Sequence, residues 1–219
     1  NNVLGVKMVL VDGTVVDIGG DWLDAAGVDL LGLIVGSEGQ LGIVTEATVR
    51  LLRQAEGARP VLFGFATPEE AAACVSDIIG HGIIPVAIEF MDKLAIEICE
   101  AFAHAGYPLD AGALLIVEVE GSDEEMEAQL QKIVAIAQQN NVKTVRESQS
   151  AMEAARIWKG RKSAFGATGR VADYICMDGT VPTSKLCHVL DETYRIVEHY
   201  GLRVANVFHA GDGNMHPLI

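Results

Sequence analysis

The chain opens with two short stretches, Val6 to Val11 and Thr14 to Ile18, that are rich in β-branched and other apolar residues. Between them stands Asp12-Gly13, a dipeptide that favours the positive φ angles of a tight hairpin turn. The apolar run Leu30 to Val35 comes later, and after a glycine cluster the pattern of Ile43 to Leu52 predicts another strand. We therefore expect the chain to begin with a β-hairpin that a further strand accompanies.

From Pro60 onward, strand patterns alternate with helix patterns. Thr67-Pro68-Glu69-Glu70 supplies an N-cap, a proline at the first helical position and a capping-box acid, and Ser122 with Glu125 forms a second capping box. The predicted strands are Val61 to Ala66, Val86 to Met91, Leu114 to Glu120, Val142 to Val145, Ala172 to Met177 and Arg203 to Phe208. The predicted helices are Pro68 to Gly80, Asp92 to His104, Ser122 to Asn140, Ser150 to Ala167 and Ser184 to Tyr200.

This alternation favours an α+β fold, a two-layer sandwich in which an antiparallel or mixed sheet carries helices. The order of the strands does not follow from the sequence. The polar segment Gln54 to Arg59, which contains Gly57, is the best candidate for a domain boundary.

Composition and charge exclude several classes of protein. The chain has 30 Asp and Glu against 16 Lys and Arg, a net charge of −14, which argues against a protein that neutralises nucleic-acid phosphates. Half of the residues are apolar, so the chain is not disordered. No run approaches the roughly 20 apolar residues of a membrane span, and the given N-terminal residues show no basic patch followed by an apolar stretch. We expect a soluble protein with no nucleic-acid partner.

The four cysteines, Cys74, Cys99, Cys176 and Cys187, contain no closely spaced pair. This distribution fits buried thiols in a reducing compartment better than a disulfide framework or a zinc knuckle. We expect a cytoplasmic protein, which could also lie peripherally at the inner face of the membrane.

The glycine cluster Gly36-Ser37-Glu38-Gly39-Gln40-Leu41-Gly42 is the first candidate for chemistry. It lacks the lysine of a phosphate-binding P-loop and does not match the Gly-x-Gly-x-x-Gly dinucleotide motif. Three glycines allow backbone amides to approach an anionic ligand closely, because no Cβ intervenes. The alternative is an ordinary glycine-rich connection.

A second candidate is His209-Ala210-Gly211-Asp212-Gly213-Asn214-Met215-His216. If residues 211–214 form a four-residue hairpin loop, His209 faces His216 with Cβ atoms roughly 4.5–5.5 Å apart. Two such imidazoles can share one metal ion, and a third ligand from elsewhere would leave a position open for substrate. The alternative is a surface hairpin whose histidines are incidental.

A third candidate is the basic stretch Arg156-Ile157-Trp158-Lys159-Gly160-Arg161-Lys162 in an acidic protein. The guanidinium fork of an arginine can bind both oxygens of a carboxylate. Arg156 and Arg161 do not quite share a helical face. The alternative is a solvated helix face.

Two of these motifs resemble a known family. The segment Gly36 to Glu46 resembles the late flavin-domain motif of FAD-linked oxidases of the vanillyl-alcohol oxidase type. The segment His209 to His216 resembles the cap-domain motif of their D-2-hydroxy-acid dehydrogenase branch, which includes bacterial glycolate oxidases. On this resemblance, residues 1–55 are the incomplete C-terminal part of an FAD-binding domain. Residues 56–219 are most of a substrate-binding cap with ferredoxin-like elements, truncated at its C-terminus.

The resemblance implies oxidation of glycolate or a small D-2-hydroxy acid such as D-lactate to the 2-oxo acid, with hydride transfer to FAD. His209 and His216 would hold a divalent metal ion such as Zn, Mn or Fe, and Arg161 would bind the substrate carboxylate. Cys176 stands where some dicarboxylate-specific relatives have lysine, which favours a small substrate. The residues expected to contact FAD are Gly36, Ser37, Glu38, Gly39, Gly42, Ile43 and Val44.

The same resemblance implies other glycolate oxidase subunits and an electron acceptor as partners, and a general base outside this chain. Because the chain begins without Met and stops where a strand pattern begins, we expect it to be part of a longer protein. By itself it is then expected to be inactive and to bind FAD weakly or not at all. The competing hypothesis is a non-catalytic α/β ligand-binding or interaction module, which gives no reason for these motifs to occur together.

Overall fold

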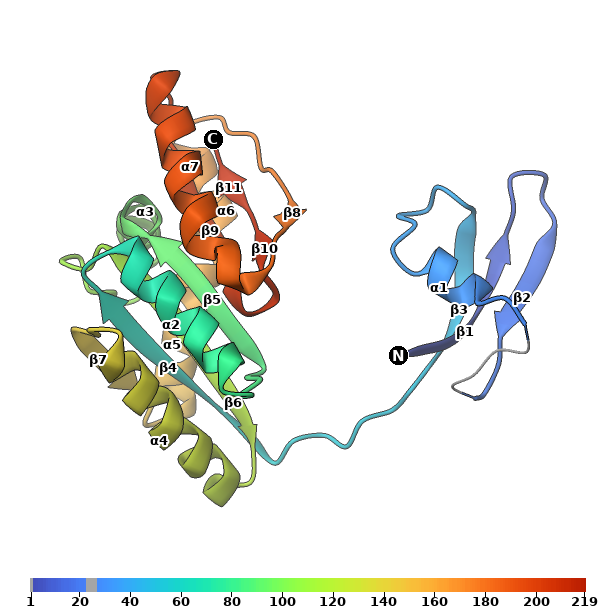
Figure 1. Cartoon of the computed structure of the whole chain (residues 1–219), viewed down its shortest axis with the longest axis horizontal. Helices are drawn as coiled ribbons and strands as arrows, with labels where there is room; N and C mark the ends of the chain where they lie inside the picture. The colour runs from blue at the N-terminus through green and yellow to red at the C-terminus, as the bar shows by residue number, and fades with distance from the viewer. Residues whose placement is uncertain (1, 23–26) are drawn as a thin grey trace. The chain divides into compact units, whose positions relative to one another are not determined.

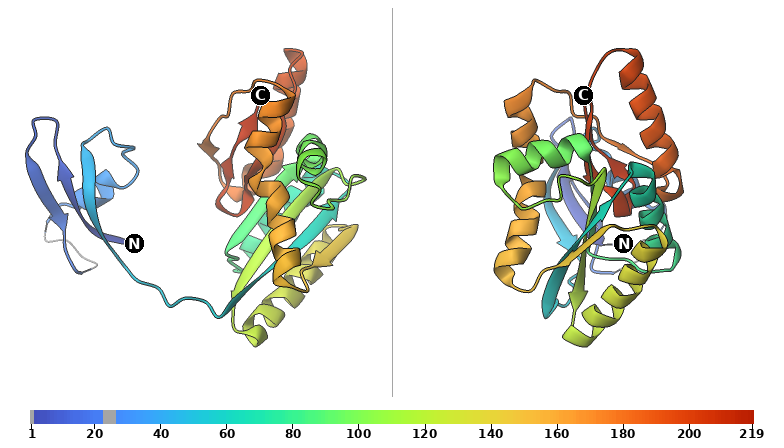
Figure 2. Two further views of the ribbon diagram at one scale, coloured as in Figure 1. Left: turned by 180° about the vertical axis from the view of Figure 1, so that it is seen from behind. Right: turned by 90° about the vertical axis from the view of Figure 1, so that its left-hand side faces the viewer.

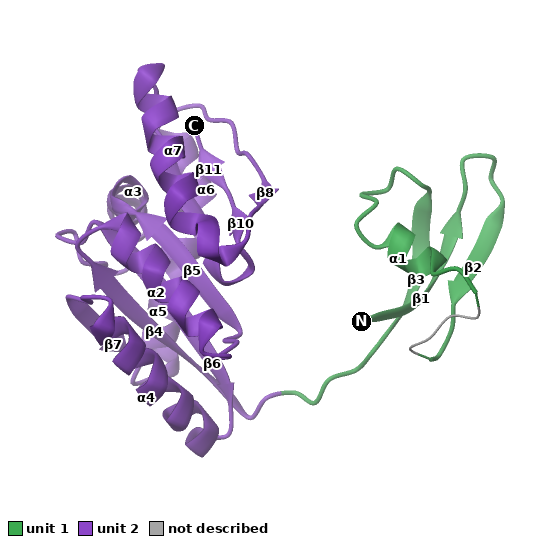
Figure 3. Cartoon of the chain, viewed as in Figure 1, with its two compact units in different colours: residues 1–54 green, residues 55–219 purple. Residues whose placement is uncertain are grey.

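The computed structural model describes residues 2–22 and 27–219 and divides into two compact units, Asn1–Gln54 and Ala55–Ile219 (Figure 3). Residues 1 and 23–26, which belong to the predicted first domain, lie outside the described residues. Residues 50–56 form neither helix nor strand. Each unit has its own hydrophobic core, so each is described separately.

The first unit is built on a three-stranded antiparallel sheet in the order β2-β1-β3. Its elements are β1 (Val3–Val9), β2 (Val15–Gly19), the short helix α1 (Leu30–Ile34) and β3 (Ile43–Val49). The predicted hairpin is confirmed, because Gly13 has a φ of 83° and the Thr14 amide donates to Asp12 Oδ1. The core of this unit consists of Val6, Met8 and Ile34.

The second unit is an antiparallel sheet in the order β7-β4-β6-β5-β9-β10-β8, with β11 paired to β9 (Figure 1). Its strands are β4 (Gly57–Phe65), β5 (Ala87–Asp92), β6 (Ala113–Gly121), β7 (Thr144–Glu147), β8 (Gly179–Thr180), β9 (Ala205–His209), β10 (Asn214–Met215) and β11 (Pro217–Leu218). Its helices are α2 (Pro68–Gly80), α3 (Lys93–Ala103), α4 (Asp123–Gln139), α5 (Ala151–Lys162), α6 (Ala164–Val171) and α7 (Leu186–His199), with short 3₁₀ helices η1 (Thr183–Lys185) and η2 (Ala210–Asp212).

Local sequence signals start two of these helices where we predicted. The Thr67 hydroxyl accepts from the Glu70 amide while the Glu70 carboxylate accepts from the Thr67 amide, and Ser122 with Glu125 repeats this reciprocal pattern. A capping box satisfies amides that the first helical turn leaves unpaired. Both predicted capping boxes are therefore confirmed.

Side chains on β4, β5, β6 and β9 alternate between two cores, one on each face of the sheet. Phe63, Phe90 and Phe208 pack with α2, α4 and α7, whereas Leu114 and Val207 pack with α3, α5 and α6. Figure 2 shows helices on both sides of the sheet. The predicted α+β class is confirmed, with an antiparallel sheet. A second helical layer is added to the expected two, because the central strands are apolar on both faces.

Two predicted elements differ from the structure. The segment Ala172 to Met177 forms only a single bridge, Cys176 to Leu218, and its Ile175 side chain is exposed, so the strand prediction was wrong there. The predicted helix Ser150 to Ala167 is two helices that meet at Ser163. Within the described part of the chain, no helix is long and apolar enough to cross a membrane.

Candidate functional site

The two motif histidines lie close together, although not in the register we predicted. His209 pairs with Asn214, so the connection consists of residues 210–213 and His216 stands diagonally across from His209. The 3₁₀ turn closes on Gly213, whose φ is 69° and where a Cβ would lie 2.0 Å from the Val181 carbonyl oxygen. The centroids of the two imidazole rings are 5.1 Å apart, with the ring planes nearly perpendicular at 87°.

A buried carboxylate joins His209 to Arg161. Glu89 lies opposite His209 in the pairing of β5 with β9, and its Oε1 is 2.8 Å from His209 Nδ1. Its Oε2 accepts from Arg161 Nε at 2.9 Å and lies 2.8 Å from Nη2. The side chains of Glu89 and Arg161 are only 7% and 8% exposed, whereas that of His209 is 45% exposed. The three residues form a continuous chain of contacts that reaches the surface at His209.

Helix α5 presents Arg161 through a contact with Tyr107. The Tyr107 hydroxyl accepts from the Arg161 amide at 2.8 Å and donates to the Ile157 carbonyl at 2.5 Å. These are the amide and carbonyl that an α-helix pairs with each other. Gly160 makes room for the ring, since a Cβ there would lie 2.4–2.5 Å from Tyr107 atoms.

His216 is the more enclosed of the two histidines, with a side chain 13% exposed. Its Nε2 is 3.5 Å from Asp178 Oδ1, which also accepts from Asn214 Nδ2. Its Nδ1 is buried and has no hydrogen-bond partner within the described residues. Burial lowers the pKa of His216, which favours the neutral imidazole.

These residues fit part of a divalent metal site. Metal ions bind neutral imidazole nitrogens, and an unpartnered buried nitrogen on His216 is available as such a donor. Among residues 2–22 and 27–219, however, no group of three or more His, Cys, Asp or Glu side chains is placed to hold a metal. Within the described residues two imidazoles therefore lie side by side, and a metal site there would need further ligands.

The glycine segment lies in the first unit, between α1 and β3. Gly36 and Gly39 have φ values of 92° and 78°, are exposed, and would meet nothing within 4 Å if they carried a Cβ. The Gly42 site is different, since a Cβ would lie 2.5 Å from Met8 Cε. The first two glycines thus leave open backbone that a ligand can approach, while Gly42 serves the packing of the unit itself. An open glycine cradle fits a dinucleotide such as FAD.

The other residues singled out in the sequence are the remaining predicted FAD contacts and Cys176. Ser37, Glu38, Ile43 and Val44 belong to the same loop and to β3, with Glu38 at a positive φ of 52° and Ile43 71% exposed. All four cysteines are free thiols, as predicted, and Cys74 and Cys99 are buried. Cys176 is exposed, so the prediction of a buried thiol was wrong there, because its segment forms a single bridge in place of a buried strand.

Sequence analysis missed Glu89 and Tyr107. The signal for Glu89 was a charged residue flanked on both sides by apolar residues of β5. Tyr107 carries no such signal, because only its contact with α5 distinguishes it.

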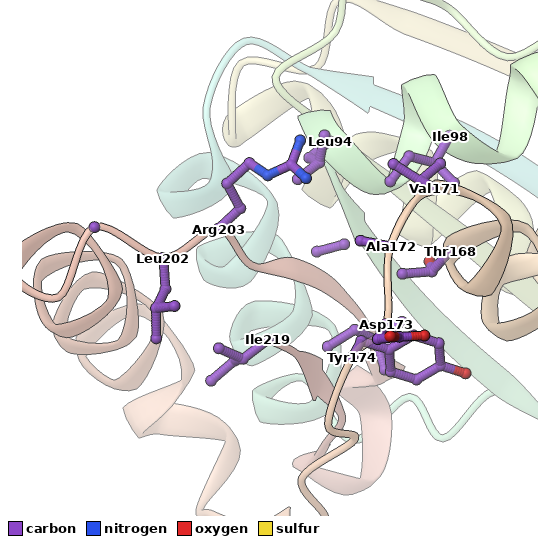
Figure 4. A pocket seen from close by; sticks show the side chains of 13 residues that line it. Leu94, Ile98, Thr168, Val171, Ala172, Asp173, Tyr174, Leu202, Arg203 and Ile219 are labelled. Carbon is purple, nitrogen blue, oxygen red and sulfur yellow. The ribbon is translucent and has the colours of Figure 1, made fainter.

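A separate cavity of about 250 Å³ lies between α3, α6 and the end of the chain's last strands. Its lining is mainly apolar, and Figure 4 shows its two charged residues, Arg203 and Asp173, on different sides. It shares no residue with the cluster of Glu89, Arg161 and the two histidines. The cavity therefore offers no converging set of reactive groups.

The chain belongs to the FAD-linked oxidases: the family model for the C-terminal domain of these enzymes matches residues 55–219. The glycolate oxidase subunit GlcD of Escherichia coli strain K12 is 47% identical over 220 residues, covering 100% of this chain and 44% of that protein. A D-lactate dehydrogenase of Archaeoglobus fulgidus is 33% identical over 224 residues, again covering the whole chain and 49% of that protein.

A solved structure extends the comparison to the fold. The structure of p-cresol methylhydroxylase with substrate bound matches with a TM-score of 0.71 at 13% identity, covering 99% of this chain and 50% of that one. At this identity the match shows a shared fold only. The chain spans about half the length of the proteins it matches, or slightly less.

Proposed function

We propose that this chain is part of an FAD-dependent enzyme that oxidises glycolate or a small D-2-hydroxy acid such as D-lactate to the 2-oxo acid. The observation that supports this most is the cluster of Arg161, His209 and His216, which combines a buried guanidinium with two adjacent imidazoles. Such a set suits a substrate with a carboxylate beside a hydroxyl. The relatives named for glycolate and D-lactate point to the same substrate class.

In this proposal the second unit is the substrate-binding cap and the first is the C-terminal part of an FAD-binding domain. The open backbone around Gly36 and Gly39 would contact the cofactor, together with the neighbouring Ser37, Glu38 and Val44. Bound FAD would supply the hydride acceptor, while the protein would supply binding, orientation and electrostatics. Partner subunits and an electron acceptor are part of the proposal, because one of the relatives is itself named as a subunit.

Arg161 would bind the substrate carboxylate through the donors that Glu89 leaves free. Its Nε–H and one Nη2–H face Glu89, which leaves the second Nη2–H and both Nη1–H for a ligand. The ion pair holds the guanidinium in place. Arg161 would therefore orient the substrate through charge-assisted hydrogen bonds from Nη1 and Nη2.

His209 and His216 would bind a divalent ion, such as Zn, Mn or Fe, near the substrate hydroxyl. A metal ion at that position orients an alcohol and acidifies it. A general base outside this chain would then take the hydroxyl proton.

The test uses the full-length protein that contains this chain. Under anaerobic conditions, glycolate or D-lactate should bleach the flavin absorbance. Arg161→Lys should lower kcat/KM for this reduction by roughly 10- to 100-fold, because losing a hydrogen bond to a charged group costs about 1.5–3 kcal/mol.

The matched control is Arg195→Lys, on the exposed face of α7. It should leave kcat/KM unchanged. Equal kinetics for the two variants would refute the role of Arg161. Failure of small 2-hydroxy acids to reduce the flavin at all would refute the proposed activity and favour a non-catalytic binding module.

A further inference from the structure

Glu89 is a buried carboxylate between apolar residues of β5, and both of its oxygens are occupied by residues of the candidate site. We propose that Glu89 is a positioning residue that fixes the tautomer of His209. It holds the proton of the neutral imidazole on Nδ1 and leaves the Nε2 lone pair free to bind a ligand.

The argument begins with which groups can donate. A guanidinium has donors only, so Glu89 Oε2 must accept from Arg161. An ionised carboxylate accepts only, so Oε1 cannot donate to His209. The 2.8 Å contact between Oε1 and Nδ1 therefore requires a proton on Nδ1. When the ring is neutral, its other nitrogen carries the lone pair.

Burial leaves the Glu89 carboxylate with few hydrogen-bond partners other than Arg161 and His209. The Glu89 side chain is 7% exposed and that of Arg161 is 8% exposed, so water has little access to the two oxygens. The pair is itself fixed by the Tyr107 contact that bonds the Arg161 amide. His209 thus meets a rigid acceptor at a set position.

The edge of the His209 ring that does not face Glu89 is then the edge that can bind a ligand. His209 is 45% exposed, its Nδ1 edge faces Glu89, and the His216 ring lies 5.1 Å away. A carboxylate that orients a ligating histidine in this way strengthens metal sites. The benefit for metal binding rests on the proposed function, whereas the tautomer does not.

A substitution separates this role from that of a simple ion pair with Arg161. In Glu89→Gln, the amide oxygen must face the donor-only guanidinium, which leaves the amide NH2 facing His209 Nδ1. Nδ1 of His209 must then accept a hydrogen bond from this NH2 group, so the proton of the neutral imidazole moves to Nε2. If Glu89 served only to pair with Arg161, the tautomer of His209 would not respond.

The experiment is a long-range ¹H–¹⁵N NMR spectrum of the ¹⁵N-labelled 219-residue chain at a pH of about 8, where an ordinary imidazole is neutral. His209 is assigned from the signals lost in His209→Gln. We expect the Nδ1–H tautomer in the wild type and the Nε2–H tautomer in Glu89→Gln. The matched control is Glu118→Gln, whose carboxylate accepts from Trp158 Nε1, and it should leave His209 in the Nδ1–H form.

A wild-type Nε2–H tautomer would overturn the inference, and this result needs only the assignment variant His209→Gln to fold, not Glu89→Gln. An unchanged tautomer in a folded Glu89→Gln chain would overturn it as well. In the full-length protein, Glu89→Gln should weaken Zn²⁺ binding by roughly 10- to 100-fold, the range for residues that orient metal ligands. If the tautomers respond as expected but no metal binds, the proposed metal site fails while the role of Glu89 stands.

Discussion

The chemistry of Glu89 depends on residues that are far away along the chain. It lies 72 positions from Arg161 and 120 from His209, yet it contacts both. A charged side chain in a buried strand is costly unless it is paired. The arginine and the histidine offset that cost, so a residue that looks anomalous in the sequence becomes the centre of the cluster.

A prediction at the scale of single residues concerns the two histidines. His216→Ala in the full-length protein should remove most of the bound divalent metal, because only one of the two imidazoles remains. Metal content per polypeptide, measured by inductively coupled plasma mass spectrometry, checks this. The control His81→Ala removes an exposed imidazole whose Nδ1 contacts the carbonyl of Asp77 and should leave the metal content unchanged. Unaltered metal content and activity in His216→Ala would disprove the assignment.

At the scale of secondary-structure elements, Gly160 allows α5 to pack closely against Tyr107. Gly160→Ala would place a Cβ within 2.4–2.5 Å of the Tyr107 ring, and overpacking of this kind costs about 1–3 kcal/mol. Urea unfolding of the chain should therefore show a lower free energy of unfolding.

Gly166→Ala, on the neighbouring helix α6, is the control, and it should change the free energy of unfolding in the opposite direction. Gly166 is exposed, and a Cβ there would meet nothing within 4 Å, so Gly166→Ala should stabilise the chain by about 0.5–1 kcal/mol through better helix propensity. Stabilisation by both substitutions would contradict the close packing of Tyr107 on Gly160.

The loop between α1 and β3 allows a similar paired test of cofactor contact. Gly39→Ala should reduce the FAD content of the purified full-length protein, since a Cβ there would intrude on the open backbone and strain a φ of 78°. Gly13→Ala imposes the same backbone strain at a φ of 83°, in the turn between β1 and β2. We expect it to retain FAD, as measured by the visible absorbance of the flavin. Equal loss in both variants would indicate destabilisation rather than lost contact.

At the scale of the whole molecule, the chain consists of two units joined by residues 50–56, which lack helix and strand. Brief trypsin treatment should cut after Arg50 or Arg53, because extended segments are accessible to proteases. Arg59 serves as an internal control, since it lies within β4 and pairs with Asp123 and Glu127. Mass spectrometry should detect a stable fragment that begins near residue 54. Early cleavage after Arg59 would contradict this division.

Local signals in the sequence determined where the main elements begin and end. Asp12-Gly13 sets a turn and the capping boxes start α2 and α4, because each depends on backbone geometry within a few residues. The two histidines of one short motif were also predicted to be neighbours, since a hairpin brings them together. Even there the predicted partner of His209 was two residues away from the observed one, Asn214, because the 3₁₀ turn that sets the register closes on Gly213 beside the Val181 carbonyl.

Tertiary structure decided everything that depends on contacts between distant segments. It set the strand order, placed helices on both faces of the sheet, and left Ala172 to Met177 without strand partners beyond one bridge. It also joined Arg161, Glu89 and His209. The physical reason is that apolar patterns specify which side chains are buried but not which partner buries them, and a buried carboxylate reveals its role only where its donors meet it.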